Sequence, residues 1–266
     1  MVCAGAVIRD VASVRGRSII QLADRITRKL KTLTTRPVSA TWPTGVISFT
    51  FDDFPKSALS AGATILESHG ARGTYYTAFG LAKTHGAPGE MFDLDDVREA
   101  FSRGHEIACH THTHINCATA KPAQLESEIR ANAAAAAAAL GGIPLINFSY
   151  PFGGISRRAK TAIRPFFASC RGIEPGINEG VPDYAELRAN RIYTSLFDEA
   201  RLRALVDRNR AVGGWLIFYT HDVGDAPSAY GCTGAELDSV VSYAASHSPV
   251  LPVREVVSAM GAARAP

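Results

Sequence analysis

Segments with strand-like and helix-like patterns alternate about eight times between residue 45 and the C-terminus. Short apolar runs of strand-forming residues are followed by longer stretches of helical periodicity, which close at glycine or proline. Strands separated by helices in this way lie parallel and are joined by right-handed crossovers. The 266-residue chain therefore predicts an α/β fold, either a (β/α) barrel or an open doubly wound sheet.

The alternation divides the chain into segments of definite type. The longest expected helix contains seven consecutive alanines, and because alanine is the strongest helix former we expect this helix to pack closely on the body of the domain. The expected strands are 46–51, 74–79, 106–109, 144–150, 167–170, 191–194, 215–220 and 249–251, and the expected helices are 56–69, 94–102, 122–140, 156–163, 199–210, 236–246 and one that begins at 254.

The first 36 residues differ from the rest in charge. They hold eight Lys and Arg against two Asp and Glu, a net charge of +6, so the remaining residues carry −3 of the overall +3. Residues 18–33 show an apolar stripe at helical spacing. This helix could pack on its own domain and expose a charged face, or residues 15–36 could make a peripheral contact with an anionic membrane. We divide the chain into a basic helical extension over 1–36 and a main domain over 37–266.

Composition excludes several classes of protein. Five cysteines without Cys-x-x-Cys spacing indicate a reducing compartment rather than a disulfide framework. No run of 18 apolar residues is present, and the first residues lack the basic leader of a secretory signal, so we expect a cytoplasmic protein. No glycine-rich phosphate loop follows any strand, and without a recognition motif no nucleic-acid partner is expected.

Two adjacent carboxylates, Asp52 and Asp53, follow the apolar run that ends at Phe51. Neighbouring side chains on a strand point to opposite faces, so the pair is expected at the C-terminal end of the strand, where both can reach solvent. In α/β folds that edge of the sheet is where ligands bind. The pair could also do no more than cap the next helix.

A second group of polar residues follows the strand expected over 106–109. His110 and His114 are four residues apart, a spacing that brings two imidazoles together on one helical turn or around a tight loop. Two histidines and one carboxylate, here Asp52 or Asp53, form a recurring catalytic metal set with open positions for water. His112 could add a third imidazole if the segment stayed extended, or could face solvent or substrate.

His221 follows the apolar run 215–220, so it is also expected at the C-terminal end of a buried strand. A histidine at the end of a buried strand is suited to proton transfer near neutral pH. It could equally be a core or capping residue.

Four stretches resemble the motifs of the polysaccharide deacetylases, carbohydrate esterase family 4. Residues 49–53 resemble the first motif, and residues 104–107 with 110–114 resemble the second. Residues 147–153 resemble the third motif and residues 216–222 the fifth. The resemblance begins near residue 45, runs to the C-terminus and excludes the basic extension.

This resemblance implies a distorted (β/α) barrel of about seven to eight parallel strands and metal-dependent removal of N-acetyl groups from N-acetylglucosamine-containing poly- or oligosaccharides. It implies that Asp53, His110 and His114 hold Zn²⁺ or another divalent transition metal, that Asp52 is the general base and that His221 is the general acid. The backbone N–H near Phe152 would help to stabilise the oxyanion. The residues expected to contact the carbohydrate are Tyr150, Pro151, Phe152, Gly153 and Tyr219.

The chain departs from the family at the third and fifth motifs. Ser149 stands where much of the family has an arginine that orients the base, Phe152 stands where a tyrosine is frequent, and Tyr219 replaces an apolar residue. The fourth motif cannot be placed. We hypothesise that Arg171, expected at the end of the neighbouring strand, reaches Asp52 instead; it could alternatively bind only loop carbonyls or Glu174.

Two other functions remain open at the sequence level. One is a non-catalytic carbohydrate-binding relative, which the retention of base, ligands and acid argues against. The other is a hydrolase of the same fold that acts on small non-sugar amides, which the substitutions at Ser149 and Tyr219 leave open.

Overall fold

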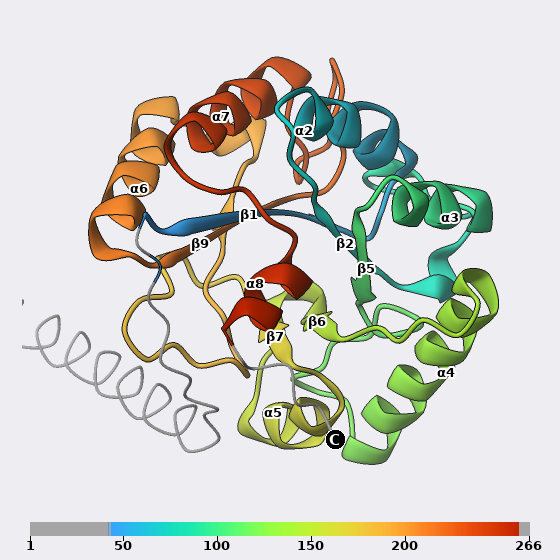
Figure 1. The fold of residues 1–266 in the computed structure, drawn as a ribbon. Coiled ribbons are helices and arrows are strands. Elements are labelled where there is room, and N and C mark those ends of the chain that lie inside the picture. The colour runs from blue at the N-terminus through green and yellow to red at the C-terminus, as the bar shows by residue number, and fades with distance from the viewer. Residues whose placement is uncertain (1–41, 43, 261–266) are drawn as a thin grey trace, which may run out of the picture.

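The computed structural model describes residues 42 and 44–260. The extension over 1–36, with its expected helix and membrane contact, lies outside the described residues. Seven strands form one parallel sheet in the order β7-β6-β5-β2-β1-β9-β8, which curls strongly into an open barrel (Figure 1). The strands are β1 (Val46–Asp52), β2 (Thr74–Thr77), β5 (Glu106–Cys109), β6 (Asn147–Ser149), β7 (Ser169–Arg171), β8 (Asn190–Arg191) and β9 (Trp215–Thr220), and β3 (His85–Gly86) pairs with β4 (Gly89–Glu90) in a separate hairpin.

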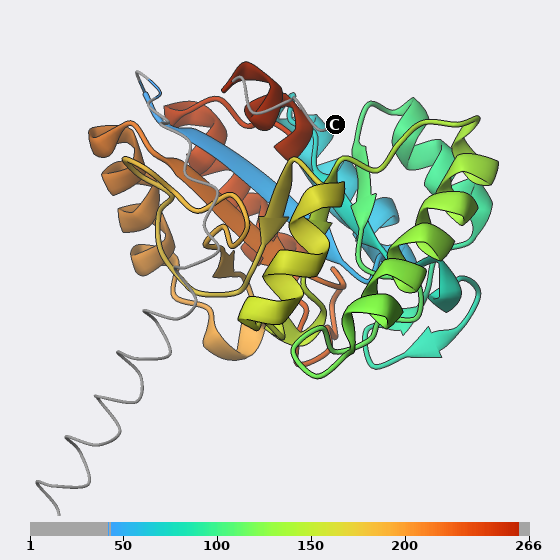
Figure 2. The ribbon, with the colours of Figure 1, turned by 90° about the horizontal axis from the view of Figure 1, so that it is seen from below.

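Helices surround the sheet on its outer side (Figures 1 and 2). One exception is α8, which lies across the middle of the ring in Figure 1, over the ends at which the strands begin. We call this end the base of the barrel and the opposite end, where the strands finish, the mouth. The α-helices are α2 (Thr64–Ser68, after a π-helical segment Ala58–Ala63), α3 (Leu94–Ser102), α4 (Pro122–Leu140), α5 (Arg157–Ile163), α6 (Glu199–Val212), α7 (Gly234–His247) and α8 (Val253–Ala259).

The distorted barrel predicted from the sequence is confirmed, with seven strands in the described sheet. The strand expected over 249–251 is wrong: Val250 forms only an isolated bridge with Ile47. Pro249 and Pro252 flank this segment, and because proline has no N–H the pairing cannot extend. The strand expected from residue 144 begins at Asn147 instead, after Pro144.

Side chains alternate along β1 between two environments. Ile47, Phe49 and Phe51 belong to the core shared with the surrounding helices. Ser48 and Thr50 are fully enclosed yet polar, and their hydroxyls donate to the carbonyls of Leu251 and Phe218. The period of two along a strand therefore places polar side chains inside the barrel and apolar ones under the helices.

Polar side chains fill the barrel at the base as well. Glu106 is buried, and its two carboxylate oxygens accept hydrogen bonds from the Thr74 hydroxyl (2.8 Å), the Asn147 amide (2.6 Å) and the Arg254 backbone N–H (2.7 Å). The Asn147 oxygen in turn accepts from Ser169 (2.7 Å). These bonds join the first residues of four neighbouring strands to α8.

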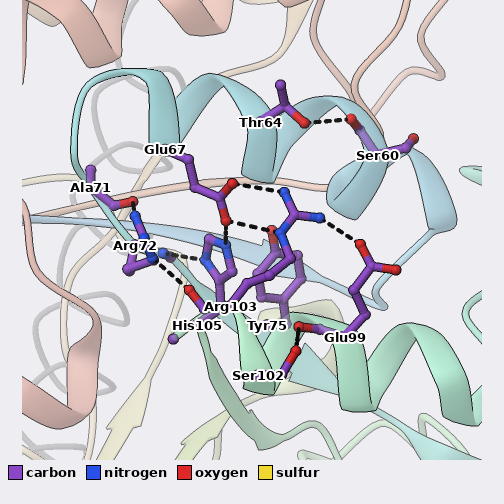
Figure 3. A network of polar contacts seen from close by, with 12 residues as sticks. Ser60, Thr64, Glu67, Ala71, Arg72, Tyr75, Glu99, Ser102, Arg103 and His105 are labelled. Carbon is purple, nitrogen blue, oxygen red and sulfur yellow. Dashed lines mark hydrogen bonds and ion pairs between the residues drawn. The ribbon is translucent and has the colours of Figure 1, made fainter.

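A second network lies at the base between α2 and α3 (Figure 3). Arg103 donates to both carboxylate oxygens of Glu67 (2.9 and 3.0 Å), and the Nε2 of the buried His105 contacts Glu67 at 2.9 Å. The Nδ1 of His105 accepts from the Gly73 N–H. Both ring nitrogens of this histidine therefore have partners within the chain.

Among the helices of the described residues, none has the length and the apolar composition that a membrane span requires.

Candidate metal centre

Asp53, His110 and His114 meet at the mouth of the barrel, as the sequence predicts. One ligand atom from each lies within 4.8 Å of the others. His114 Nε2 is 3.1 Å and His110 Nε2 is 3.5 Å from Asp53 Oδ1. Asp53 directly follows β1, and the two histidines follow β5, two strands away in the sheet. The curl of the sheet brings these strand ends together.

The backbone is strained around this cluster. Six non-glycine residues of the described chain have positive φ, and five of them lie beside the cluster: Asp53, Phe54, Thr111, His114 and Phe152. A non-glycine residue in this region costs of order 1–3 kcal/mol, so it persists only where the surroundings enforce it. Positive φ at Asp53 turns its carboxylate out of the alternation of β1, so that it faces the histidines rather than the helices.

The atoms of the cluster that face one another have no hydrogen-bond donor between them among the described residues. His110 Nδ1–H donates to the Ser149 carbonyl at 2.8 Å, which leaves a lone pair on the Nε2 that faces Asp53. Asp53 Oδ1 is buried and has no hydrogen-bond partner among the described residues. Lone pairs that converge without a proton between them repel one another, and a cation at their centre would convert this repulsion into attraction.

Burial shifts the pKa values of all three residues. It lowers the pKa of His110 to about 3 and lowers that of His114, so both imidazoles are neutral and able to coordinate. Burial also raises the pKa of Asp53 to about 6, against the opposing effect of His221 and with a smaller contribution from Asp52. Neutral imidazoles and one carboxylate are the ligands that zinc and related divalent metals take in hydrolases. The three residues fit such an ion.

Asp52 lies beside the cluster and is held by Arg171. Asp52 is the last residue of β1, points into the barrel and is 4% exposed, so the expectation that both acids reach solvent is wrong. The Arg171 guanidinium donates to Asp52 Oδ1 and to the Ser149 hydroxyl. Ser149 and Arg171 are paired in register on β6 and β7. Arg171, on the neighbouring strand, therefore makes the contact with Asp52 that Ser149 is too short to make. The predicted contact between Arg171 and Asp52 is confirmed.

Two tyrosines enclose the guanidinium. The Arg171 guanidinium carbon lies 4.9 Å from the ring centroids of both Tyr76 and Tyr219. Burial alone would raise the pKa of Asp52, but the charge of Arg171, assisted by His110 and His221, holds that pKa below its usual range. Asp52 is therefore a carboxylate at neutral pH, fixed in orientation and next to the candidate metal ligands.

His221 approaches the cluster from the other side, at the end of β9. Its Nδ1 is 3.2 Å from the Tyr230 carbonyl and must carry the proton of that bond, so Nε2 faces the site, 4.0 Å from Asp53 Oδ2. The structure thus brings together the five residues predicted for metal binding and proton transfer, with Arg171 beside the predicted base.

Three of the five residues predicted to contact the carbohydrate are buried. The prediction that Tyr150 contacts the carbohydrate is wrong, because Tyr150 is 1% exposed and its hydroxyl donates to the Ala185 carbonyl. The alternation that turns Ser149 into the barrel turns Tyr150 towards the helices. Pro151 is buried, and Tyr219 is 4% exposed and packs on Arg171. Phe152 is 66% exposed, with its ring centroid 4.4 Å from that of His114, and the neighbouring Gly153 has a φ of +63°.

Glu128 is a site residue that the sequence did not reveal. It lies on α4, and its carboxylate accepts from the backbone N–H groups of His112 (2.9 Å) and Thr113 (2.7 Å) and from the Thr113 hydroxyl (2.8 Å). It thereby holds the loop between the two histidines. Nothing in its local sequence distinguishes it from the other acids of α4, because its role depends on how α4 packs against the loop.

Comparison with known proteins agrees with these features. The family model described as polysaccharide deacetylase matches residues 39–166. No sequence among the curated proteins matches the chain.

Several solved structures share the fold at low sequence identity. A protein assigned as a polysaccharide deacetylase from Mycobacterium smegmatis is 14% identical, with a TM-score of 0.58 over 86% of this chain and 95% of that one. A family 4 acetyl xylan esterase from Clostridium thermocellum in complex with a cobalt ion is 17% identical, with a TM-score of 0.56 over 81% of this chain and 92% of that one. A deacetylase solved with substrate is 13% identical, with a TM-score of 0.53 over 81% and 92% of the two chains.

Proposed function

Because this chain belongs to the polysaccharide deacetylase family, we propose that it is a metal-dependent hydrolase that removes N-acetyl groups from N-acetylglucosamine-containing oligo- or polysaccharides. The observation that carries the proposal is the convergence of Asp53, His110 and His114 within 4.8 Å, with a separate, arginine-held carboxylate beside them. Amide hydrolysis requires an activated water, stabilisation of the oxyanion and a proton for the departing amine.

Asp53, His110 and His114 would hold the metal. A divalent cation in such a site supplies Lewis acidity, which polarises the amide carbonyl and makes water more acidic. The structure of the related esterase contains cobalt, and we propose zinc or another divalent transition metal here. The two histidines and Asp53 would use all their facing lone pairs on the cation, so none of the three would be left to accept a proton.

Asp52 would accept the proton of the attacking water. Its carboxylate stays ionised because Arg171 is beside it, and the bond from Arg171 to Oδ1 leaves Oδ2 for the proton. Ser149 and the two tyrosines hold the guanidinium in place. Asp52 therefore has the orientation that a general base needs.

His221 would donate the proton to the departing amine. Its Nδ1–H is engaged by the Tyr230 carbonyl, which fixes the ring so that Nε2 faces the site. The backbone N–H near Phe152 would stabilise the oxyanion from the third-motif turn.

Metal content and acetate release test this function directly. The purified full chain should bind about one divalent ion and should release acetate from acetylated chito-oligomers, peptidoglycan fragments or poly-N-acetylglucosamine. Acetylated xylan belongs in the same panel because a protein of this fold is an acetyl xylan esterase. Bound metal with no acetate from any N-acetylated glycan would contradict the proposal.

A further inference from the structure

A turn over residues 228–231 lies against the end of β9 and holds His221. The Tyr230 carbonyl, in this turn, accepts from the His221 backbone N–H at 3.2 Å and from its ring Nδ1–H at 3.2 Å. The same carbonyl accepts from the Thr220 hydroxyl at 3.3 Å. The position of one carbonyl therefore fixes the direction in which Nε2 of His221 points. We call residues 228–231 the carbonyl turn.

Asp222, the residue after His221, holds the carbonyl turn. It is 7% exposed, and its Oδ2 accepts from the Ser228 N–H at 2.7 Å and its Oδ1 from the Ser228 hydroxyl at 2.6 Å. The Ser228 hydroxyl oxygen accepts in turn from the Tyr230 N–H at 3.1 Å. A continuous chain of hydrogen bonds therefore runs from the Asp222 carboxylate to the residue whose carbonyl binds His221. Ser228 engages both carboxylate oxygens, so Asp222 acts on the histidine through the turn rather than by direct contact.

The carbonyl turn packs tightly around this carboxylate. A Cβ added at Gly231 would lie 2.5 Å from both Cγ and Oδ1 of Asp222, so the close approach requires glycine. The Cys232 N–H donates to the Asp222 carbonyl at 3.0 Å, and the Gly231 N–H donates to the Ser228 carbonyl at 3.1 Å. The side chain and the backbone of Asp222 thus hold the turn at both of its ends.

Resting on the function proposed above, we infer that Asp222 acts through the carbonyl turn to aim His221 Nε2 at the departing amine, which favours amides over esters as substrates. In that step the proton moves from Nε2 to the amide nitrogen as the C–N bond breaks. An amine leaves only when it is protonated, so amide hydrolysis needs an aimed acid. An activated ester such as p-nitrophenyl acetate releases a stable phenolate without a proton.

A carboxylate suits the place of Asp222 because two donors of Ser228 converge on it. An amide side chain has one acceptor oxygen and would turn N–H groups towards the second donor. Asp222→Asn should therefore loosen the carbonyl turn while leaving the size of the side chain nearly unchanged.

Parallel rates on an amide and an ester test the inference on the metal-loaded full chain. In Asp222→Asn, acetate release from acetylated chito-oligomers should fall about tenfold, a part of what general acid catalysis contributes, whereas hydrolysis of p-nitrophenyl acetate should change by about twofold or less. Metal content should stay the same. Ser228→Ala, which removes the hydroxyl and keeps the N–H, should give the same pattern and serves if Asp222→Asn does not fold. Asp225→Asn, at an exposed position of the same loop, is the matched control and should alter neither rate.

Two further measurements separate positioning from general support of the fold. In a His221→Ala background, Asp222→Asn should lower the amide rate no further, because the group that it positions is gone. Nitrogen-15 spectra at a pH where the ring is neutral should show the Nδ1–H tautomer of His221 in the parent chain and its loss in Asp222→Asn.

Equal losses on amide and ester, a loss that persists in His221→Ala, or an unchanged tautomer would each overturn the inference. A parent chain that releases no acetate from any N-acetylated glycan would contradict the proposed function instead. The tautomer of His221 does not depend on turnover, so the spectra would still decide whether Asp222 fixes the ring.

Discussion

The two histidines that flank β5 are both buried, but they differ in whether their ring nitrogens have hydrogen-bond partners. His105, just before the strand, accepts from the Gly73 N–H through Nδ1 and donates to Glu67 through Nε2. His110, just after it, donates to the Ser149 carbonyl through Nδ1, and its Nε2 faces the carboxylate of Asp53 with no proton between them. At the base both ring nitrogens of the histidine have hydrogen-bond partners in the chain. At the mouth only Nδ1 has one among the described residues.

The buried acids differ in the same way. Glu106, at the base, accepts hydrogen bonds at both oxygens from three donors of the chain. Asp53, at the mouth, keeps a buried oxygen without a hydrogen-bond partner among the described residues. A buried acceptor without a partner costs about 1–3 kcal/mol. In these two pairs the residues at base and mouth do not differ in burial, and what separates them is the unmatched lone pairs that converge at the mouth.

The largest effect should come from replacing one histidine of each kind. On the proposed function, His110→Ala should abolish metal binding and acetate release, since it removes one of the three proposed ligands. His105→Ala should keep the metal but lower the free energy of unfolding by about 1–3 kcal/mol, because the Gly73 N–H and Glu67 lose their partner. Mass-spectrometric metal content and denaturant unfolding measure both. A folded His105→Ala protein without metal would break the contrast between base and mouth.

Asp52→Asn should be next in magnitude. An amide cannot accept the proton, so turnover should fall about 10²- to 10⁴-fold while the metal content stays the same. Asp53→Asn should lose the metal instead. The two variants are compared by metal content and by the rate of acetate release, and a reversal of their effects on metal content would exchange the two assignments.

Glu128→Gln tests the support of the metal loop. Its amide group would present N–H to the loop donors at one of its two positions, so the histidines would be held less firmly. We expect metal affinity to fall about 10- to 100-fold, as for other groups that position ligands. Glu126→Gln is the control, because Glu126 lies on the same helix and pairs only with Arg130 at the surface in the described contacts. Equal metal affinities in competition with a chelator would refute the role of Glu128.

Arg171→Lys should lower turnover about tenfold without loss of metal, because lysine cannot reproduce the planar fork of the guanidinium. The pKa of Asp52 is raised by burial and lowered by Arg171, so weakening the Arg171 contribution raises it. The base must be ionised, and activity is lost as pH falls through its pKa. The acidic limb of the pH–rate profile should therefore move to higher pH. An unmoved limb with a normal rate would show that Arg171 is not needed to tune the base.

The smallest effect is expected from removal of residues 1–36. We propose that residues 1–36 are a separate extension, since the family match begins at residue 39. Their deletion should leave turnover of soluble substrates largely unchanged and should remove any binding to anionic lipid vesicles. A truncated chain that fails to fold would show instead that the extension is part of the barrel.

Local sequence determined the types of most elements and the core of the candidate site. The ranges of α3, α4 and β5 match those expected, because caps, prolines, glycines and short apolar runs act over a few residues. The meeting of His110 and His114 with the Asp52–Asp53 pair could also be predicted, since parallel strands in alternation with helices must finish at the same end of the sheet. The resemblance to a known family added the division of roles between Asp52 and Asp53.

Tertiary structure decided which side chains face one another. The contact of Arg171 with Asp52 was only a hypothesis until the register of β6 and β7 placed Arg171 beside Ser149. Tyr150 was mistaken for a substrate contact, because the point at which β6 ends decides which face it joins. Glu128 could not be found, since its partners are reached only when α4 packs against the histidine loop. Element type depends on neighbours in sequence, but strand register and helix packing depend on contacts between distant segments, which no local pattern records.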